Sequence, residues 1–338
     1  MIDITLANFE SDLIKASLQQ PVLLDIWAEW CGPCKALGPV LEALETEYGG
    51  RFLLAKVNAD EQQEIAGQLS QMFGVRSIPF CVMFVGGQPV DGFVGALPAE
   101  KIREFLDKHV PGEGEIVSEL ETLEAEQLAE SGDTETALAK LEDALAKDPG
   151  NDEARYDLIK LLLAEGALEG AQAIFAPIAD RATGLLAEQR VNAFGRYIDA
   201  LAAARQGRSP AELSAAIEAN KRDFTARFEL AQIFFASGHF TEAMDELLEI
   251  IMRDKGWNDE LARKTYVAIL EVMSKPQPKP IPPKAAAAAG AAEGKPQLEI
   301  AGKVAVTAND PVVDKYRQPS YVERASAMSA TLASIQWA

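Results

Sequence analysis

One short motif, Cys31-Gly-Pro-Cys34, restricts the possible folds of this chain more than any other feature. Residues 22–28 before it are apolar except for one carboxylate, a pattern typical of a buried strand. Residues 35–44 after it have the apolar spacing of an amphipathic helix. Two cysteines at this spacing, between a strand and a helix, indicate a redox pair rather than half of a zinc site.

The position of the motif also assigns a role to each cysteine. Cys31 is expected at the N-terminus of the helix, where free backbone N–H groups and the helix dipole favour a thiolate. Cys34 lies one turn further in, where its sulfur can attack a mixed disulfide and release the reduced substrate. Pro33 falls in the first turn, the part of a helix that tolerates proline. The motif therefore predicts thiol–disulfide exchange, with Cys31 as nucleophile and Cys34 as resolving thiol.

A metal site is not expected. Structural zinc needs two further Cys or His ligands, and only Cys81, His109 and His239 remain, at no ligand-like spacing. Cys81 is predicted to be a small buried apolar residue, with a regulatory thiol near the disulfide as the alternative. His109 and His239 are predicted to be structural.

Residues 1–110 resemble a thioredoxin along their whole length. The resemblance rests on several separate motifs rather than on the cysteine pair alone. The matching residues are Asp25, the run 27–35, Lys56 within 54–60, the run 73–79 that ends in Pro79, and the run 94–97.

This resemblance implies a sheet of four or five strands flanked by helices, with Pro79 in the cis form beside the disulfide. It also implies that buried Asp25 relays a proton to or from Cys34, with Lys56 nearby; the alternative is a buried carboxylate without a catalytic role. No cofactor is expected apart from the Cys31–Cys34 disulfide. The implied substrate groove consists of Trp30, Gly32, Pro33, Ile78, Pro79 and Gly95.

The middle of the chain, residues 115–274, is predicted to be helical and repetitive. Residues 128–137 align with residues 162–171 at an offset of 34, the period of a tetratricopeptide repeat. A later copy at 226–243 leaves space for one degenerate repeat that turns near Gly207. Glycines are expected to end the first helix of each pair, and small residues to let the paired helices approach closely; these are Gly132, Gly166 and Gly238, and Ala137, Ala171 and Ala243.

A proline- and alanine-rich linker is predicted after the repeats. Beyond it, apolar residues at spacings of three and four predict an amphipathic helix that packs on the repeats or docks in a partner. Met328, Leu332 and Ile335 are its candidate contact residues. The predicted fold is thus an α/β thioredoxin domain followed by an all-α tetratricopeptide-like domain. The predicted boundaries are 1–111 for the thioredoxin domain, 112–274 for the repeats, 275–311 for the linker and 312–338 for the terminal helix.

Composition narrows the function further. The formal charge of −20 argues against binding to nucleic acid or to an anionic membrane surface. Residues 111–275 alone contain 17 basic and 32 acidic side chains. No run of 18 apolar residues exists, and the N-terminus lacks the pattern of a secretory signal. Three cysteines, two of them in a redox motif, fit a reducing compartment, so a cytoplasmic location is expected.

A thioredoxin domain followed by divergent repeats is similar to the bacterial chaperedoxin family, also called CnoX or YbbN. The similarity includes residues 87–93, residues 263–266 and the Lys315-Tyr316-Arg317 run. It implies a protein that holds unfolding or oxidised clients, protects their cysteines from overoxidation and passes them to GroEL–GroES or to DnaK. Thioredoxin reductase is the expected recycling partner. Because this chain keeps both cysteines of the motif, it is expected to reduce disulfides as well.

Two other functions are compatible with the sequence. One is an ordinary thioredoxin whose repeats dock a single dedicated substrate. The other is a repeat scaffold whose cysteine pair senses oxidation. Replacing Cys31 and Cys34 by serine separates the three possibilities. A holdase keeps its antiaggregation activity, a plain reductase loses all activity, and a sensor loses only its redox response.

Overall fold

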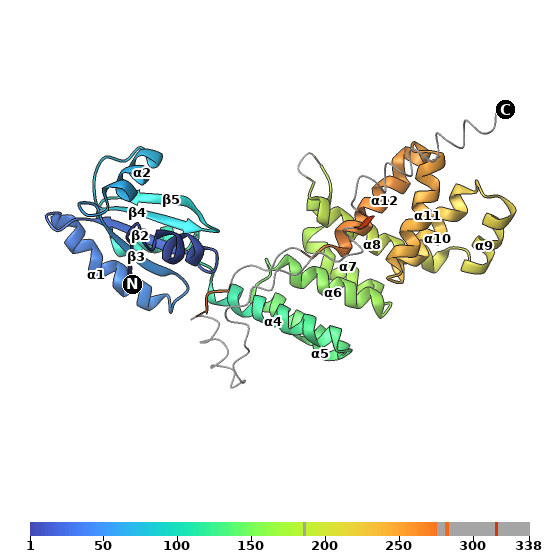
Figure 1. Cartoon of the computed structure of the whole chain (residues 1–338). Coiled ribbons are helices and arrows are strands. Elements are labelled where there is room, and N and C mark those ends of the chain that lie inside the picture. The colour runs from blue at the N-terminus through green and yellow to red at the C-terminus, as the bar shows by residue number, and fades with distance from the viewer. Residues whose placement is uncertain (185–186, 276–280, 284–314, 317–338) are drawn as a thin grey trace, which may run out of the picture. The chain divides into compact units, whose positions relative to one another are not determined.

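A computed structural model describes residues 1–184, 187–275, 281–283 and 315–316 (Figure 1). The chain divides into two compact units. The first contains Met1–Leu123 and Ala146–Asn151, and the second contains Glu124–Leu145 together with residues 152–275 and 315–316. The division falls inside two helices, α4 (Glu113–Glu130) and α5 (Thr134–Lys147). Each unit is described by itself below.

The first unit is built on a five-stranded sheet with the order β1-β3-β2-β4-β5 (Figure 1). The three strands β1, β3 and β2 run parallel, whereas β4 is antiparallel to both β2 and β5. β2 is therefore the central strand, and all of its residues except Trp27 are buried. The strands are β1 (Ile2–Asp3), β2 (Val22–Trp27), β3 (Leu53–Asn58), β4 (Phe80–Val85) and β5 (Gln88–Val94).

Helices cover both faces of this sheet. One core joins strand residues such as Leu24 to α2 (Gln63–Phe73) and to a π-helical turn at Phe9–Lys15. The other joins residues such as Leu23 to α1 (Gly32–Glu47) and α3 (Ala99–Leu106). Because side chains alternate along a strand, consecutive residues of β2 serve opposite cores.

Helical pairs follow, each connected by a short turn. A glycine with positive φ ends the first helix of three pairs: Gly132 at 88°, Gly166 at 73° and Gly238 at 76°. This left-handed conformation suits glycine because it has no Cβ. The pairs are α4 with α5 (Thr134–Lys147), α6 (Asp152–Ala164) with α7 (Leu168–Phe175), α8 (Gln189–Gln206) with α9 (Pro210–Ala219), and α10 (Phe224–Ala236) with α11 (Phe240–Arg253).

The degenerate repeat expected near Gly207 is the pair α8 and α9. Gly207 has an extended backbone, with φ −84° and ψ −177°, so this turn differs from the other three. The three expected small contact residues, Ala137, Ala171 and Ala243, are fully buried. A 3-10 segment (Ala176–Ala182) continues α7, and α12 (Trp257–Met273) follows the last pair.

The structure confirms the predicted fold class, a mixed α/β thioredoxin sheet followed by a helical repeat region. In the described part of the chain, no helix is both long enough and apolar enough to cross a membrane. Most of the predicted linker and nearly all of the predicted terminal helix lie outside the described residues. This includes Met328, Leu332 and Ile335.

Candidate active site

The two cysteines of the motif lie where β2 gives way to α1. Cys31 is the N-cap residue of α1, and its sulfur accepts a hydrogen bond of 3.2 Å from the backbone N–H of Cys34. The two sulfurs form a disulfide that joins Cα atoms 5.3 Å apart. Both residues are 3% exposed and pack against Ala28 and Ile78. The predicted redox pair is thus present as a disulfide at a helix N-terminus.

Exposed residues border this disulfide. The Trp30 side chain is 72% exposed, and its indole N–H donates a 2.9 Å hydrogen bond to Asp60. Gly32 and Pro33 are exposed as well. A large apolar ring at the surface, next to a nearly buried disulfide, offers a contact area for a protein substrate.

The segment that precedes β4 packs against the motif through Ile78, and the segment that follows β5 lies next to it. The Ile78–Pro79 peptide bond is cis, as the resemblance implied. The Pro79 carbonyl accepts a 2.8 Å hydrogen bond from the backbone N–H of Gly95, which has φ 89°. Since β4 runs antiparallel to both neighbours, its start lies at the same sheet edge as the ends of β2 and β5. Every residue of the predicted groove therefore lies at one edge of the sheet.

The carboxyl group of Asp25 lies on β2, the strand that precedes the motif, and Asp25 is 1% exposed. Its cross-strand partners are Lys56 on β3 and Cys81 on β4. Burial raises the pKa of Asp25 to about 6, against the smaller opposing effects of the Lys56 charge and the Cys81 hydrogen bond. A pKa this close to neutrality suits a group that exchanges a proton during catalysis.

α1 covers the face of the sheet on which Asp25 lies. The neighbouring inward positions on β2 and β3, Leu23 and Leu54, pack in the core that contains the Leu37 and Leu41 side chains of α1. A Cβ atom added to Gly38 would lie 3.6 Å from the Lys56 ammonium nitrogen. Cys34 precedes Gly38 by four residues, so both face the sheet.

Lys56 also contacts α1 directly. Its ammonium group lies 2.7 Å from a carboxylate oxygen of Glu42, and its side chain is 15% exposed. The lysine thus lies between a buried carboxyl group on its own sheet and a surface carboxylate on the helix. The supporting role of Lys56 toward Asp25 stays a prediction.

Cys81 contributes more to the site than sequence reasoning predicted. It is fully buried, as expected of a small apolar residue. However, its sulfur lies 3.7 Å from Asp25 Oδ1 as a hydrogen-bond donor. Burial, with the neighbouring Asp25 charge, raises the pKa of the Cys81 thiol well above its usual value, so the thiol keeps its proton. Only the register of β2 and β4 reveals this contact.

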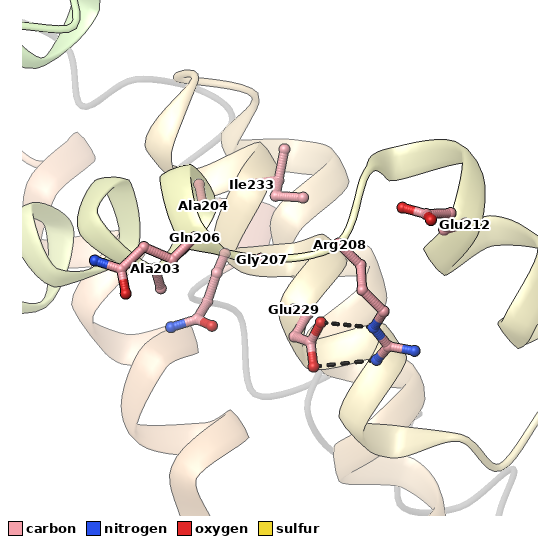
Figure 2. Close-up of a pocket in the computed structure, with 9 residues that line it drawn as sticks. Ala203, Ala204, Gln206, Gly207, Arg208, Glu212, Glu229 and Ile233 are labelled. Atoms are coloured by element: carbon pink, nitrogen blue, oxygen red, sulfur yellow. Dashed lines mark hydrogen bonds and ion pairs between the residues drawn. The ribbon is translucent and has the colours of Figure 1, made fainter.

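The second unit contains an open pocket of about 610 Å³ where α8, α9 and α10 meet. Figure 2 shows the Arg208 guanidinium paired with the Glu229 carboxylate at its side, through two hydrogen bonds of 3.0 Å each. This pocket was not predicted from the sequence. The lining is mostly polar: Ala203, Ala204, Gln206, Gly207, Arg208, Glu212, Glu229, Gln232 and Ile233.

Comparisons with known proteins agree with both units. The thioredoxin family profile matches residues 1–108, and two tetratricopeptide repeat profiles match residues 128–188 and 203–280. A thioredoxin of Chlorobaculum thiosulfatiphilum is 45% identical over 103 residues, which are 30% of this chain and 90% of that protein. A thioredoxin of Haemophilus influenzae is 42% identical over 104 residues, 31% of this chain and 92% of that protein. One from Pseudomonas aeruginosa is 40% identical over 110 residues, 32% of this chain and 96% of that protein.

The fold and the disulfide at the helix N-terminus define the class of this protein as a thiol–disulfide oxidoreductase with an added helical repeat region. The chain belongs to the thioredoxin family through its first 108 residues. Its architecture is a thioredoxin domain followed by tetratricopeptide repeats.

Proposed function

We propose that this protein is a redox-active chaperedoxin. It holds unfolding proteins, exchanges disulfides with their cysteines and passes them to a chaperonin, for which GroEL–GroES is the candidate. DnaK is a second candidate acceptor. The proposal is supported chiefly by one observation: a complete thioredoxin-type site and a tetratricopeptide repeat region occur in one chain.

The redox half of the proposal follows from the site. In the dithiol form, Cys31 thiolate attacks a client disulfide, so that one client sulfur leaves and a mixed disulfide forms. Cys34 then gives its proton to the Asp25 carboxylate and attacks the Cys31 sulfur. The bond between Cys31 and the client breaks, the second client sulfur leaves as a thiolate, and the Cys31–Cys34 disulfide remains. Two electrons pass from the protein to the client, and thioredoxin reductase is the proposed source of their replacement.

The holdase half rests on the surfaces that a client can reach. Among the described residues, most of the large apolar side chains that are well exposed belong to the first unit, including Trp30 just before the motif and Val94 at the end of β5. In the part of the second unit that the structure describes, Val267 is the large apolar side chain that is well exposed. We therefore propose that apolar client segments contact the thioredoxin surface, while the repeats supply polar contacts such as those of the Arg208 pocket.

Aggregation of a client tests the holdase activity directly. A chemically unfolded client that contains no cysteine is diluted into buffer with the full chain, or with the full chain carrying Cys31→Ser and Cys34→Ser. Light scattering is expected to fall by more than half at equal molar amounts for both proteins, because holding needs no sulfur chemistry. Insulin reduction, run in parallel, is expected only for the wild type.

Other outcomes select a different function. If neither protein suppresses scattering while the wild type reduces insulin, the chain is a thioredoxin with a docking module. If the wild type suppresses scattering only in one redox state and the serine variant no longer responds, the cysteine pair is a sensor.

A further inference from the structure

The structure places a thiol against the carboxyl group that the mechanism uses as a base. Asp25 and Cys81 are directly opposite each other on β2 and β4, so their side chains extend from the same face of the sheet. The Cys81 sulfur lies 3.7 Å from Asp25 Oδ1, within reach of a hydrogen bond to sulfur. Cys81 is 0% exposed and Asp25 is 1% exposed, so water does not compete for this contact.

Besides Cys81, Asp25 faces groups on the neighbouring strand β3 and on the helix α1. Lys56 on β3 lies opposite Asp25, and its ammonium nitrogen is also 2.7 Å from a carboxylate oxygen of Glu42 on α1. On α1, Cys34 lies one turn before Gly38, and its thiol is ionisable only in the dithiol form, because it is disulfide-bonded in this structure. The rest of this core includes the apolar residues Leu54, Met83 and Phe93, together with Tyr48, whose hydroxyl donates a hydrogen bond to Asp107. Lys56 and Cys81 are therefore the two groups that favour the ionised carboxylate, one on each side of it.

We propose that Cys81 is a positioning residue for the redox reaction, whose thiol donates a hydrogen bond to Asp25 and thereby sets the pH at which Asp25 can accept the Cys34 proton. This inference rests on the proposed role of Asp25. A thiol is a weak hydrogen-bond donor, but the hydrogen bond is stronger when the acceptor is an ionised carboxylate that is shielded from solvent. The thiol keeps its proton because burial raises its own pKa.

Hydrogen bonding and packing can be separated with three substitutions at one position. Cys81→Ala removes the donor and leaves a small cavity, Cys81→Val removes the donor and fills the space, and Cys81→Ser restores a donor. If the hydrogen bond matters, Ala and Val both raise the pKa of Asp25, by about 0.5 to 1, and Ser returns it to the wild-type value or below. If only volume matters, Val behaves as the wild type.

The experiment uses the full chain in its disulfide and dithiol forms. Carboxyl-carbon NMR follows the titration of Asp25, and the rate at which the mixed disulfide resolves is measured from pH 5 to 9. The midpoint of the rate profile is expected to rise with the Asp25 pKa in the Ala and Val variants and to return with Ser. Val82→Ala is the matched control, because it opens a cavity on the same strand but in the opposite core.

The two ways to fail are distinct. An Asp25 pKa that is the same in wild type, Ala and Val, or one that tracks side-chain volume, overturns the role of Cys81 whatever the enzyme rates are. A wild type that resolves no mixed disulfide at any pH overturns the proposed redox function instead. The NMR titration still decides about Cys81 in that case.

Discussion

At the scale of single residues, Asp25 couples protonation to stability. Its pKa is raised from 3.8 to about 6, because burial penalises the charged form. The folded state therefore binds this proton more tightly than the unfolded state does. Stability contributed by the protonated carboxyl is present below pH 4 and is lost as the pH rises through about 6. The full loss is about 3 kcal/mol.

Asp25→Asn is consequently expected to stabilise the protein at alkaline pH. The neutral amide avoids the cost of a buried charge, so the variant should exceed the wild type by up to about 3 kcal/mol at pH 8. At pH 4 the two proteins should be nearly equal. Urea denaturation of the disulfide form at both pH values measures the difference; equal stability at pH 8 would show that the charge is well solvated.

Asp91 provides a control of opposite sign. Partial burial acts to raise its pKa, but hydrogen bonds from His109 and from the Gly92 N–H outweigh this and hold the pKa below its usual value. Stability from this carboxylate is therefore present at neutral pH and is lost as the pH falls through its lowered pKa. Asp91→Asn should destabilise the protein at pH 8, where Asp25→Asn stabilises it.

Most of the redox site could be predicted at this scale. The spacing of Cys31 and Cys34 defines the pair, and the resemblance to thioredoxins placed Pro79 in cis, as found. The Cys81–Asp25 contact could not be predicted from residues alone. It depends on which residue of β4 lies opposite Asp25, and a shift of one position would turn Cys81 to the other face.

At the scale of elements, α9 shows how a degenerate repeat keeps its helix. Ser209 accepts a hydrogen bond from the Glu212 N–H at 3.3 Å, and Glu212 accepts one from the Ser209 N–H at 2.8 Å. This capping box satisfies two donors that the first turn would leave free. In the other three pairs a left-handed glycine forms the turn, whereas Gly207 has an extended backbone. In this pair the capping box defines where α9 begins.

Ser209→Ala is expected to cost about 1 kcal/mol, the usual effect of losing an N-cap. The matched control is Ser214→Ala, an exposed position in the middle of the same helix, which should be neutral or slightly stabilising. Amide exchange across α9 reports both variants. Equal protection in the two would mean that packing of Leu213 and Ile217, not the cap, holds the helix.

The sequence predicts the repeats well for a physical reason. Each turn glycine occupies a backbone conformation that other residues adopt poorly, so the period of 34 is visible in one sequence. Packing partners are less visible. The aromatic pairs Tyr156–Phe194 and Tyr197–Phe235 stack with ring centres 4.2 and 4.7 Å apart, across helices that are distant in sequence.

At the scale of the whole molecule, Tyr316 packs in a core whose other residues lie much earlier in the sequence. Tyr316 is 4% exposed within the large hydrophobic core of the second unit. Its backbone carbonyl accepts a hydrogen bond from the Tyr266 hydroxyl at 3.3 Å, and its own hydroxyl lies 3.4 Å from Asp245. The spacing of apolar residues predicts the contacts of this region further along the chain, because such spacing cannot identify a single anchoring ring.

Removing that ring should loosen the helices that hold it. Tyr316→Ala is expected to lower the stability of the second unit by about 3 kcal/mol, as for other buried aromatic rings, and to speed amide exchange in α11 and α12. Tyr316→Phe keeps the ring and loses the hydroxyl contact with Asp245, so it should cost about 1 kcal/mol or less. Amide exchange in the sheet of the first unit should not change in either variant.

If Tyr316→Ala leaves α11 and α12 as protected from amide exchange as in the wild type, the core of the second unit is complete without the Tyr316 ring. In that case the Tyr316 ring can exchange this contact for one with a partner.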